Sequence, residues 1–379
     1  MLTTHAGSLP RPSALVALLA RSSKGEPVDQ AELDRLTDAA VAEVVSRQHD
    51  VGIDIGNDGE QGRESFFTYV QHRMTGFGPG DSITRTWEDV DDFPGFAEVR
   101  RAQRSAGEQV TLTRPPHAVA EVTYGDPSAI DAECARLIRE LEQKPFGQAF
   151  MTAPSPGIVA AAMANRYYAT DDEYLAALGS ALAVEYRRII DAGLLLQIDA
   201  PDLAMEHHGA FAGRPVTEFL SFVERVIDTI NQAVEGLPAE RLRLHVCWGN
   251  YGGPHTHDIP LADLLPLLYG ARVGALLVSG GNPRHEHEYR EFARQPLPDG
   301  WTLAAGVIDT TTNYVEHPEV VADRLVRVAE AVGDPARVLA CTDCGFDTAA
   351  GFGIVAPDVA WEKLRSLRAG ADLASERLF

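Results

Sequence analysis

The feature that most constrains the fold is a repeated alternation of short apolar runs with longer segments of helical periodicity. Eight strands are predicted at Thr3–Leu9, Val51–Gly56, Gln148–Ala153, Leu194–Asp199, Leu242–Cys247, Ala275–Ser279, Leu303–Ile308 and Val338–Cys341. Strands that alternate with helices predict an α/β fold. Eight of them favour a closed (β/α)8 TIM barrel, a single domain over residues 1–379.

The helical patterns between the strands lie at Gln30–Gln48, Asp131–Leu141, Asp172–Ala192, Val216–Val234, Pro318–Val332 and Asp358–Arg368. An open doubly wound sheet is the alternative, but no Gly-x-Gly-x-x-Gly follows a predicted strand to bind a dinucleotide. Residues 75–124 fit the repeat poorly, because they hold Gly-Pro-Gly, the acidic run Glu88–Asp92 and a Val-Thr-Leu-Thr segment. We expect an inserted hairpin or lid there, between the second and third strands.

Charge and composition limit the partners. The chain has 379 residues, of which 45% are hydrophobic, and a formal charge of −22 with no basic cluster. This charge repels nucleic acid and anionic membrane surfaces. The partners are therefore expected to be small molecules, and a homo-oligomer is compatible with the sequence.

The location is predicted to be cytoplasmic. No stretch approaches roughly 18 consecutive apolar residues, and residues 1–5 have neither the basic region nor the apolar segment of a signal peptide. Four cysteines in a chain of this length do not suggest a disulfide framework. Thiol chemistry in a reducing compartment is the preferred interpretation.

Polar residues concentrate where the predicted strands end. In a barrel, the carboxyl ends of the strands and the loops after them form the active face. The residues at these positions are His5, Ser8, Asp58, Glu60, Asp199, Asp202, His245, Cys247, Asn250, Asn282, Arg284, His285, Asp309, Asp343 and Cys344.

Three of these residues form a set of metal ligands. His245 and Cys247 share one face of a strand, and Cys344 can add a third ligand from another strand end. An imidazole and two thiolates suit zinc, and three protein ligands leave a position for substrate. Two alternatives remain: a buried cysteine beside a hydrogen-bonded histidine, and a structural Cys3His site completed by Cys341. Strand alternation argues against the second, since it points Cys341 and Cys344 to different faces.

A zinc ion with an open position would act on a thiol. Coordination lowers the pKa of the thiol to near neutral and directs its sulfur. The expected reaction is attack of that sulfur on an electrophilic carbon.

Other polar runs have weaker interpretations. Residues 252–258 and 284–288 are rich in metal-capable groups but lack HExxH spacing, so capping and loop bracing are favoured over a second metal. Arg284 could clamp an anionic group of the substrate. Carboxylates at Glu60, Asp199 and Asp202 suit an ammonium group, with solvated loop charges as the alternative. Gly7 and Ser8 offer a backbone N–H and a hydroxyl to a carboxylate.

Several motifs resemble the cobalamin-independent methionine synthase family. They are Thr-His-Ala-Gly-Ser-Leu-Pro-Arg-Pro at the start, Asp-Gly-Glu at 58–60, Gln-Ile-Asp at 197–199, His-Val-Cys at 245–247, Asn-Pro-Arg-His-Glu-His-Glu at 282–288, Gly-Val-Ile-Asp at 306–309 and Asp-Cys-Gly at 343–345. The resemblance spans nearly the whole chain but only the C-terminal catalytic barrel of the family. Short members, such as epoxyalkane:coenzyme M transferase, are similar in size.

The resemblance implies a zinc site at His245, Cys247 and Cys344. The family's fourth ligand, a glutamate, corresponds to Ser279 here, so Glu286, Cys341 or a water would have to replace it. Homocysteine binding is implied for Gly7, Ser8, Glu60 and Asp199, although the second glutamate of the family's Glu60 motif falls at Gly62.

The folate side of the family pattern is different in this chain. The family's proton-donating histidine corresponds to Thr311, and the tryptophan that stacks on the pterin falls near Ala160. Loss of a general acid costs about 10²–10⁴-fold in rate. We therefore expect a donor other than methyltetrahydrofolate.

The sequence as a whole predicts a zinc-dependent thiol S-alkyltransferase of the methionine synthase type, acting in methionine biosynthesis. The residues expected to act are Asp309 and His285 in catalysis, Gly7, Ser8, Glu60, Asp199, Asp202, Asn250 and Arg284 in substrate binding, and His245, Cys247 and Cys344 at zinc. The carboxylates favour an amino-acid thiol, whereas Arg11, Arg63 and Arg284 could meet a sulfonate such as coenzyme M. The alternatives are addition of a thiol to an epoxide, and a metal-free lyase resembling uroporphyrinogen decarboxylase.

Overall fold

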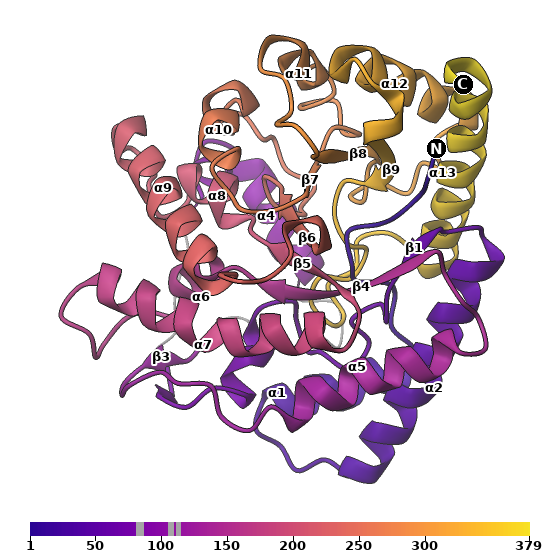
Figure 1. The fold of residues 1–379 in the computed structure, drawn as a ribbon. Helices are drawn as coiled ribbons and strands as arrows, with labels where there is room; N and C mark the ends of the chain where they lie inside the picture. Colours follow the sequence, from indigo (N-terminus) through magenta and orange to yellow (C-terminus); the bar gives the residue numbers. More distant parts are fainter. Residues whose placement is uncertain (81–86, 105–109, 111–114) are drawn as a thin grey trace.

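The centre of the fold is a parallel sheet of seven strands in the order β1-β4-β5-β6-β7-β8-β9. The computed structural model describes residues 1–379 apart from 81–86, 105–109 and 111–114. The strands are β1 (Ile55–Gly56), β4 (Gln148–Pro154), β5 (Leu195–Asp199), β6 (Leu242–Val246), β7 (Ala275–Val278), β8 (Thr302–Ile308) and β9 (Val338–Thr342). Figure 1 shows this sheet curled on itself, with the long helices outside it.

The N-terminal segment lies between the two edge strands of the sheet. Thr3 forms a parallel bridge with Ala340 of β9, and Thr4 forms one with Ile55 of β1. In Figure 1 this segment, in indigo, runs from the N-terminus beside β9 toward β1. The α/β class with a curled parallel sheet is therefore confirmed. The predicted first strand, Thr3–Leu9, is represented by two isolated bridges only.

Among the described residues, eight helices accompany the strands of the main sheet: α1 (Ser13–Ser23), α2 (Gln30–Asp50), α5 (Ser128–Leu141), α7 (Asp171–Asp191), α9 (Val216–Ala233), α10 (Leu261–Leu268), α12 (Pro318–Val332) and α13 (Pro357–Leu378). Helix α13 continues ten residues beyond the predicted end at Arg368. Its last turns are held because Ala371 and Ala374 are fully buried in the main core.

The other described helices lie mostly in the loops. They are α3 (Glu88–Asp91), α4 (Pro94–Arg104), α6 (Pro156–Ala162), α8 (Asp202–Met205), α11 (Glu291–Arg294) and the 3₁₀ turns η1 (Thr68–His72), η2 (Glu206–His208), η3 (Ala239–Arg241), η4 (Glu288–Arg290) and η5 (Pro335–Arg337). Among the described residues, no helix combines the length and apolarity needed to cross a bilayer.

Strand alternation decides which side chains face the interior of the curled sheet. In β6, Leu242, Leu244 and Val246 join the main apolar core. Arg243 and His245 point the other way, where Arg243 donates a hydrogen bond of 2.9 Å to Gln197 of β5. These polar side chains therefore lie inside the curled sheet.

Residues 75–124 form an excursion between β1 and β4. Strands β2 (Phe77–Gly78) and β3 (His117–Ala118) pair antiparallel, and α3 and α4 lie between them in the chain. Asp89 of α3 accepts hydrogen bonds from the backbone N–H groups of Thr256 and His257, so the excursion contacts the loop after β6. Most of the predicted Val-Thr-Leu-Thr segment lies outside the described residues.

Candidate metal centre

The structure brings His245, Cys247 and Cys344 together at the carboxyl edge of the sheet. His245 is in β6, Cys247 follows it directly, and Cys344 lies two residues after β9. One ligand atom from each lies within 4.8 Å of the others, and all three side chains are buried. This arrangement is the one predicted from strand alternation and from the ends of β6 and β9.

Two aspartates position the three ligands. Asp199 Oδ1 lies 3.0 Å from His245 Nδ1. This contact fixes the ring and leaves Nε2 directed toward the segment that carries Cys344. The carboxylate of Asp343 accepts hydrogen bonds from the backbone N–H groups of residues 280, 281 and 282, which ties the loop after β7 to the segment carrying Cys344.

The charges at this site favour a thiolate at Cys247, whereas burial and the neighbouring Cys247 raise the pKa of the Cys344 thiol. Burial alone would lower the pKa of His245, but hydrogen bonds to Asp199 and Cys247 raise it to about 10. The pKa of the Cys247 thiol lies well below its usual value, because Cys344 donates a hydrogen bond to it and His245 adds positive charge. One buried imidazole and two buried sulfurs within 4.8 Å of one another fit a borderline metal ion such as zinc.

None of the protein groups considered as a fourth ligand reaches this cluster. Cys341 is buried with Leu277 and Ala304 inside the curled sheet. Glu286 lies within 3.6 Å of the side chains of Arg324 and Arg327. Neither residue is therefore placed to serve as the fourth ligand. Strand alternation directs Cys341 to another layer, and Glu286 is paired with arginines.

Ser279 occupies the position next to the cluster. Its hydroxyl donates to the carbonyl of Asp343 at 2.9 Å and lies 4.0 Å from Cys344 Sγ. A serine hydroxyl is a poor ligand for zinc compared with the carboxylate that the family pattern has there. Among the described residues, the cluster therefore has three protein ligands.

A cavity of about 140 Å³ opens onto the three ligands. Its walls combine polar and apolar residues, and they include Ser8, Glu60, Phe66, Phe67, Asp199, Met205, His245, Cys247 and Cys344. We call this space the inner cavity. Phe66, Phe67 and Met205 carry no motif and follow no predicted strand, so sequence reasoning missed them.

Two consecutive turns place Glu60 in the inner cavity. Asn57 Oδ1 accepts from the N–H of Gly59, and Asp58 Oδ1 accepts from the N–H of Glu60. Thr152 donates to one oxygen of Glu60, while the other oxygen, Oε2, is buried with no hydrogen-bond partner. Burial and the neighbouring charge of Asp199 raise the pKa of Glu60 to about 8.

Gly7 allows this approach of Glu60. Its φ of +133° suits glycine, and a Cβ at this position would lie 2.4 Å from Glu60 Oε1. Gly7 therefore contributes by leaving room for Glu60 and by adopting a backbone conformation that suits glycine. Its neighbour Ser8 lines the cavity itself.

Three other predicted binding residues lie away from the inner cavity. Asp202 has a fully buried side chain that accepts a hydrogen bond of 2.5 Å from Ser155, and it lines neither cavity described here. Arg11 is paired with Asp347 at 2.9 Å. Arg63 is paired with Glu133 at 2.9 Å. Each has a partner in the core, and neither Arg11 nor Arg63 lines either cavity, so their roles toward substrate stay predictions.

A larger cavity, of about 490 Å³, lies on the other side of Cys344. We call it the outer cavity. Its lining includes Tyr251, His255, Ser279, Arg284, His285, Asp309 and Thr311. Gly249, Asn250 and Cys344 line both cavities, so the two spaces meet at the metal ligands.

Asn250 braces the loops between the cavities. It donates to the carbonyl of Gly345 at 2.8 Å and accepts from the hydroxyl of Thr310 at 2.9 Å. Asp309 fixes the position of Thr311, because its Oδ1 accepts hydrogen bonds from both the N–H and the hydroxyl of Thr311 at 2.8 Å. Arg284 is exposed at the outer cavity, where its guanidinium donates only a long bond to Thr256 O.

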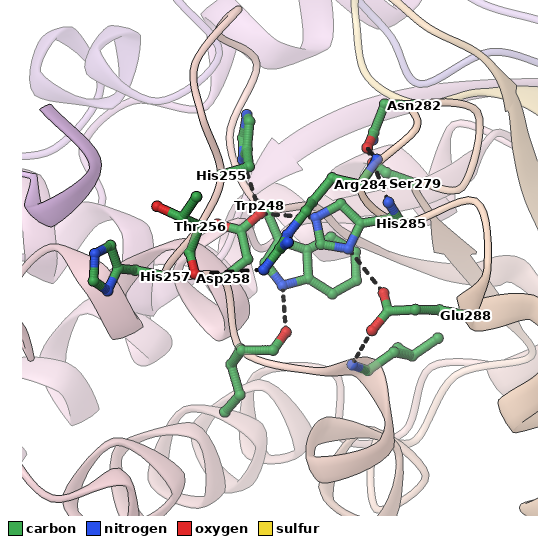
Figure 2. A network of polar contacts seen from close by, with 12 residues as sticks. Trp248, His255, Thr256, His257, Asp258, Ser279, Asn282, Arg284, His285 and Glu288 are labelled. Carbon is green, nitrogen blue, oxygen red and sulfur yellow. Dashed lines mark hydrogen bonds and ion pairs between the residues drawn. The ribbon is translucent and has the colours of Figure 1, made fainter. Parts of the chain in front are cut away.

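Two carboxylates and a tryptophan ring restrain the side chain of His285. Figure 2 shows its ring between Asp258 and Glu288 and against Trp248. Its two nitrogens lie 2.8 Å from these two carboxylates, and its ring stacks on Trp248 at 3.8 Å. Burial would lower the pKa of His285, but the two carboxylates raise it to about 9. These contacts favour bracing of this loop by His285, and its catalytic role stays a prediction.

A parallel α/β sheet with metal ligands and two adjoining cavities at its carboxyl edge is the architecture of an enzyme acting on small molecules. No family model matches the chain. Methionine synthase from Thermococcus kodakarensis is 26% identical over 99% of this chain and 94% of its own length. Methionine synthase from Saccharolobus solfataricus is 24% identical over 99% of this chain and 95% of its own.

Two solved structures have the same fold. A B12-independent methionine synthase from Shewanella sp. W3-18-1, in complex with selenomethionine, gives a TM-score of 0.72 at 22% identity over 99% of this chain and 98% of its own. A putative vitamin-B12 independent methionine synthase from Listeria monocytogenes gives 0.66 at 18% identity, with 98% of each chain covered. The chain is similar to methionine synthases over nearly its whole length, as its motifs predict, and this likeness indicates an enzyme of the methyltransferase class.

Proposed function

We propose that the protein is a zinc-dependent S-alkyltransferase that acts on a small amino-acid thiol such as homocysteine. One observation carries the proposal: the inner cavity presents His245, Cys247 and Cys344 together with the carboxylates of Glu60 and Asp199. The ligands suit a metal that binds sulfur, and the carboxylates suit an ammonium group.

The charges of the inner cavity favour an amino acid over a sulfonate. Arg11 and Arg63 are engaged with carboxylates in the core. The residues that line the inner cavity include two acids and no arginine or lysine. A sulfonate there would face carboxylates without a cation, whereas an ammonium group would supply the hydrogen-bond donor that Glu60 Oε2 lacks.

The two cavities support a direct transfer. We place the thiol in the inner cavity and the alkyl donor in the outer one, so that their reacting atoms meet beside Cys344. Zinc, when bound, lowers the pKa of the thiol and fixes the position of its sulfur. A carbon–sulfur bond forms, the bond from that carbon to its leaving group breaks, and the thiol proton passes to solvent.

The protein's own residues orient the partners. Glu60 and Asp199 bind the ammonium group, and Ser8 offers its hydroxyl to the substrate carboxylate. Asp309 and Arg284 are the groups available to a donor in the outer cavity. Because Thr311 replaces the family's proton-donating histidine, we infer a donor whose leaving group departs without a general acid, rather than methyltetrahydrofolate.

We also propose that the fold is a complete (β/α)8 barrel in which residues 3–4 serve as the first strand. The bridges of Thr3 to β9 and Thr4 to β1 support it. Closure in this way brings Ser8 to the segment after β9, since the N–H of Phe346 donates to the carbonyl of Ser8.

Metal content and thiol binding test the function together. We expect the wild-type protein to bind zinc and Cys247→Ser to lose it from the three-ligand centre. The control is Cys134→Ser, which changes a buried cysteine of α5 remote from the cluster and should lose no zinc. X-ray absorption at the zinc edge should gain a sulfur neighbour when homocysteine is added. Preference for coenzyme M would favour thiol addition to an epoxide, and a protein with no metal and no thiol binding would favour the lyase.

A further inference from the structure

A second cluster of metal-capable side chains lies outside the metal centre. It consists of Asp89 from α3, His208 from η2 and Asp258 from the loop between β6 and α10. One ligand atom from each lies within 4.8 Å of the others. The side chains of Asp89 and His208 are 0% exposed, and that of Asp258 is 1% exposed.

Among the residues that the structure describes, the histidine in this cluster has no hydrogen-bond partner. Neither ring nitrogen of His208 has a partner, and the Oδ1 atom of Asp258 also has none. A fully buried imidazole is normally bonded at one or both nitrogens. Burial lowers the pKa of His208 below its usual value, which favours the neutral form that binds metal.

The spacing of His208 Nε2 and Asp258 Oδ1 matches coordination to one ion better than hydrogen bonding, and an ion bound at Nε2 does not use Nδ1. His208 Nε2 lies 3.5 Å from Asp258 Oδ1, and Nδ1 lies 3.9 Å from Asp89 Oδ2. A hydrogen bond between such atoms spans about 2.7–3.2 Å. Two ligands bound tetrahedrally to one zinc at about 2.0–2.1 Å lie about 3.3–3.4 Å apart, close to the first of these separations.

The two neighbouring histidines, His255 and His285, have hydrogen-bond partners at both ring nitrogens, unlike His208. His255 Nδ1 and His285 Nε2 both lie 2.8 Å from Asp258 Oδ2, which is a hydrogen-bond length. The other nitrogen of each ring is also bonded, that of His255 to Tyr251 O and that of His285 to Glu288. These two rings orient Asp258 and leave its Oδ1 directed at His208, as outer contacts do around a metal ligand.

From this geometry we propose that Asp89, His208 and Asp258 bind a second divalent transition-metal ion, of the zinc or manganese class. One imidazole and two carboxylates form a harder set than the thiolate centre, so the two sites differ in preference. The ion would join α3 of the excursion to the loop that carries Tyr251 and His255 on the wall of the outer cavity. This inference does not depend on the proposed alkyl transfer.

Anomalous diffraction from wild-type crystals tests the site without a variant. Crystals soaked in zinc chloride, and separately in manganese chloride, would be measured on both sides of the metal absorption edge. We expect a peak among Asp89, His208 and Asp258 with at least one of the two ions, in addition to the peak at the thiolate centre. No peak at this cluster with either ion would overturn the proposal.

Variants separate this site from the first one. In equilibrium dialysis against zinc alone, we expect two ions per wild-type chain, one in Cys247→Ser and one in His208→Gln. His207→Gln is the matched control, because His207 lies on the same turn and its Nδ1 lies 3.0 Å from His257 O rather than in the cluster. Added zinc should raise the Tm of Cys247→Ser by about 2 °C or more but not that of Cys247→Ser/His208→Gln. Retention of two ions by a folded His208→Gln would contradict the assignment.

Discussion

His245 Nδ1 and Asp199 Oδ1 lie 3.0 Å apart, and both side chains are buried at the end of neighbouring strands. Asp199 also lines the inner cavity and accepts a hydrogen bond from Gln197 at 2.8 Å. One carboxylate thus orients a metal ligand and faces the substrate position. The proposed metal and thiol sites are therefore expected to be coupled through Asp199.

Replacement of Asp199 by asparagine should weaken both sites. Loss of an outer contact to a ligating histidine typically costs about 10–100-fold in metal affinity. We expect a loss of this size for zinc at the thiolate centre in competition with a chelator, and weaker binding of homocysteine. Asp309→Asn, which removes a carboxylate from the outer cavity, should leave that zinc affinity unchanged, and equal zinc affinity in wild type and Asp199→Asn would contradict the coupling.

Glu60 should make binding of an amino acid depend on pH. Its pKa of about 8 in the ligand-free protein means that it is mostly protonated at pH 7, whereas an ammonium group needs the ionised form. Methionine, which has no thiol proton, should therefore release nearly one proton as it binds at pH 7, and its affinity should rise between pH 6.5 and about 8. Calorimetry in buffers of different ionisation enthalpy measures this release.

Glu60→Gln is the control for that measurement. The amide cannot titrate, so we expect the proton release and this pH dependence to disappear and the affinity to fall. An unchanged proton release in Glu60→Gln would assign the titration to another group.

Gly7→Ala should damage the inner cavity as well as the backbone. The new Cβ would lie 2.4 Å from Glu60 Oε1 and 2.9 Å from Thr152 Cγ2, at a φ of +133°. We expect a loss of about 1–3 kcal/mol in the free energy of unfolding. Binding of homocysteine should weaken too, because Glu60 must move.

Gly25→Ala provides the comparison. Gly25 has a φ of +72° but nothing within 4 Å of its added Cβ, so it tests backbone strain alone. We expect a loss of about 1 kcal/mol in urea unfolding and normal binding of homocysteine. A Gly7→Ala protein that binds homocysteine as tightly as Gly25→Ala does would contradict the role given to Gly7.

Ser279→Glu should add a fourth ligand to the thiolate centre. The Ser279 hydroxyl lies 4.0 Å from Cys344 Sγ, so a longer side chain from this position can reach the metal. We expect zinc to be held at least about tenfold more tightly, as measured by chelator competition. Ser279→Ala should have nearly wild-type affinity, and a glutamate variant with no gain would mean that position 279 is not directed at the metal.

The positions of the metal ligands could be predicted because they depend on strand periodicity. His245 and Cys247 are two residues apart, and Cys344 follows a strand whose apolar run is plain in the sequence. The ends of parallel strands meet at one edge, so ligands far apart in the chain come together without any knowledge of side-chain contacts.

The roles of charged residues were harder to predict, because they depend on partners that periodicity does not identify. Arg11 is paired with Asp347, and Arg63 with Glu133. His285 is held by Asp258 from a different loop. Each residue has the type expected in a binding site and follows a strand, yet each is paired with a carboxylate of the protein. The cluster at His208 was missed for the same reason, since its three members come from three separate segments.

The pairing of Thr3 with Ala340, and of Ser8 with Phe346, has a consequence for biosynthesis. Thr3 must wait for its partner Ala340, which is made more than 300 residues later, before either has its neighbour. The nascent chain consequently exposes the rim of an unfinished pocket until β9 and the segment after it have been made. Ribosome-bound chains stopped before β9 should therefore be unable to retain zinc at the thiolate centre.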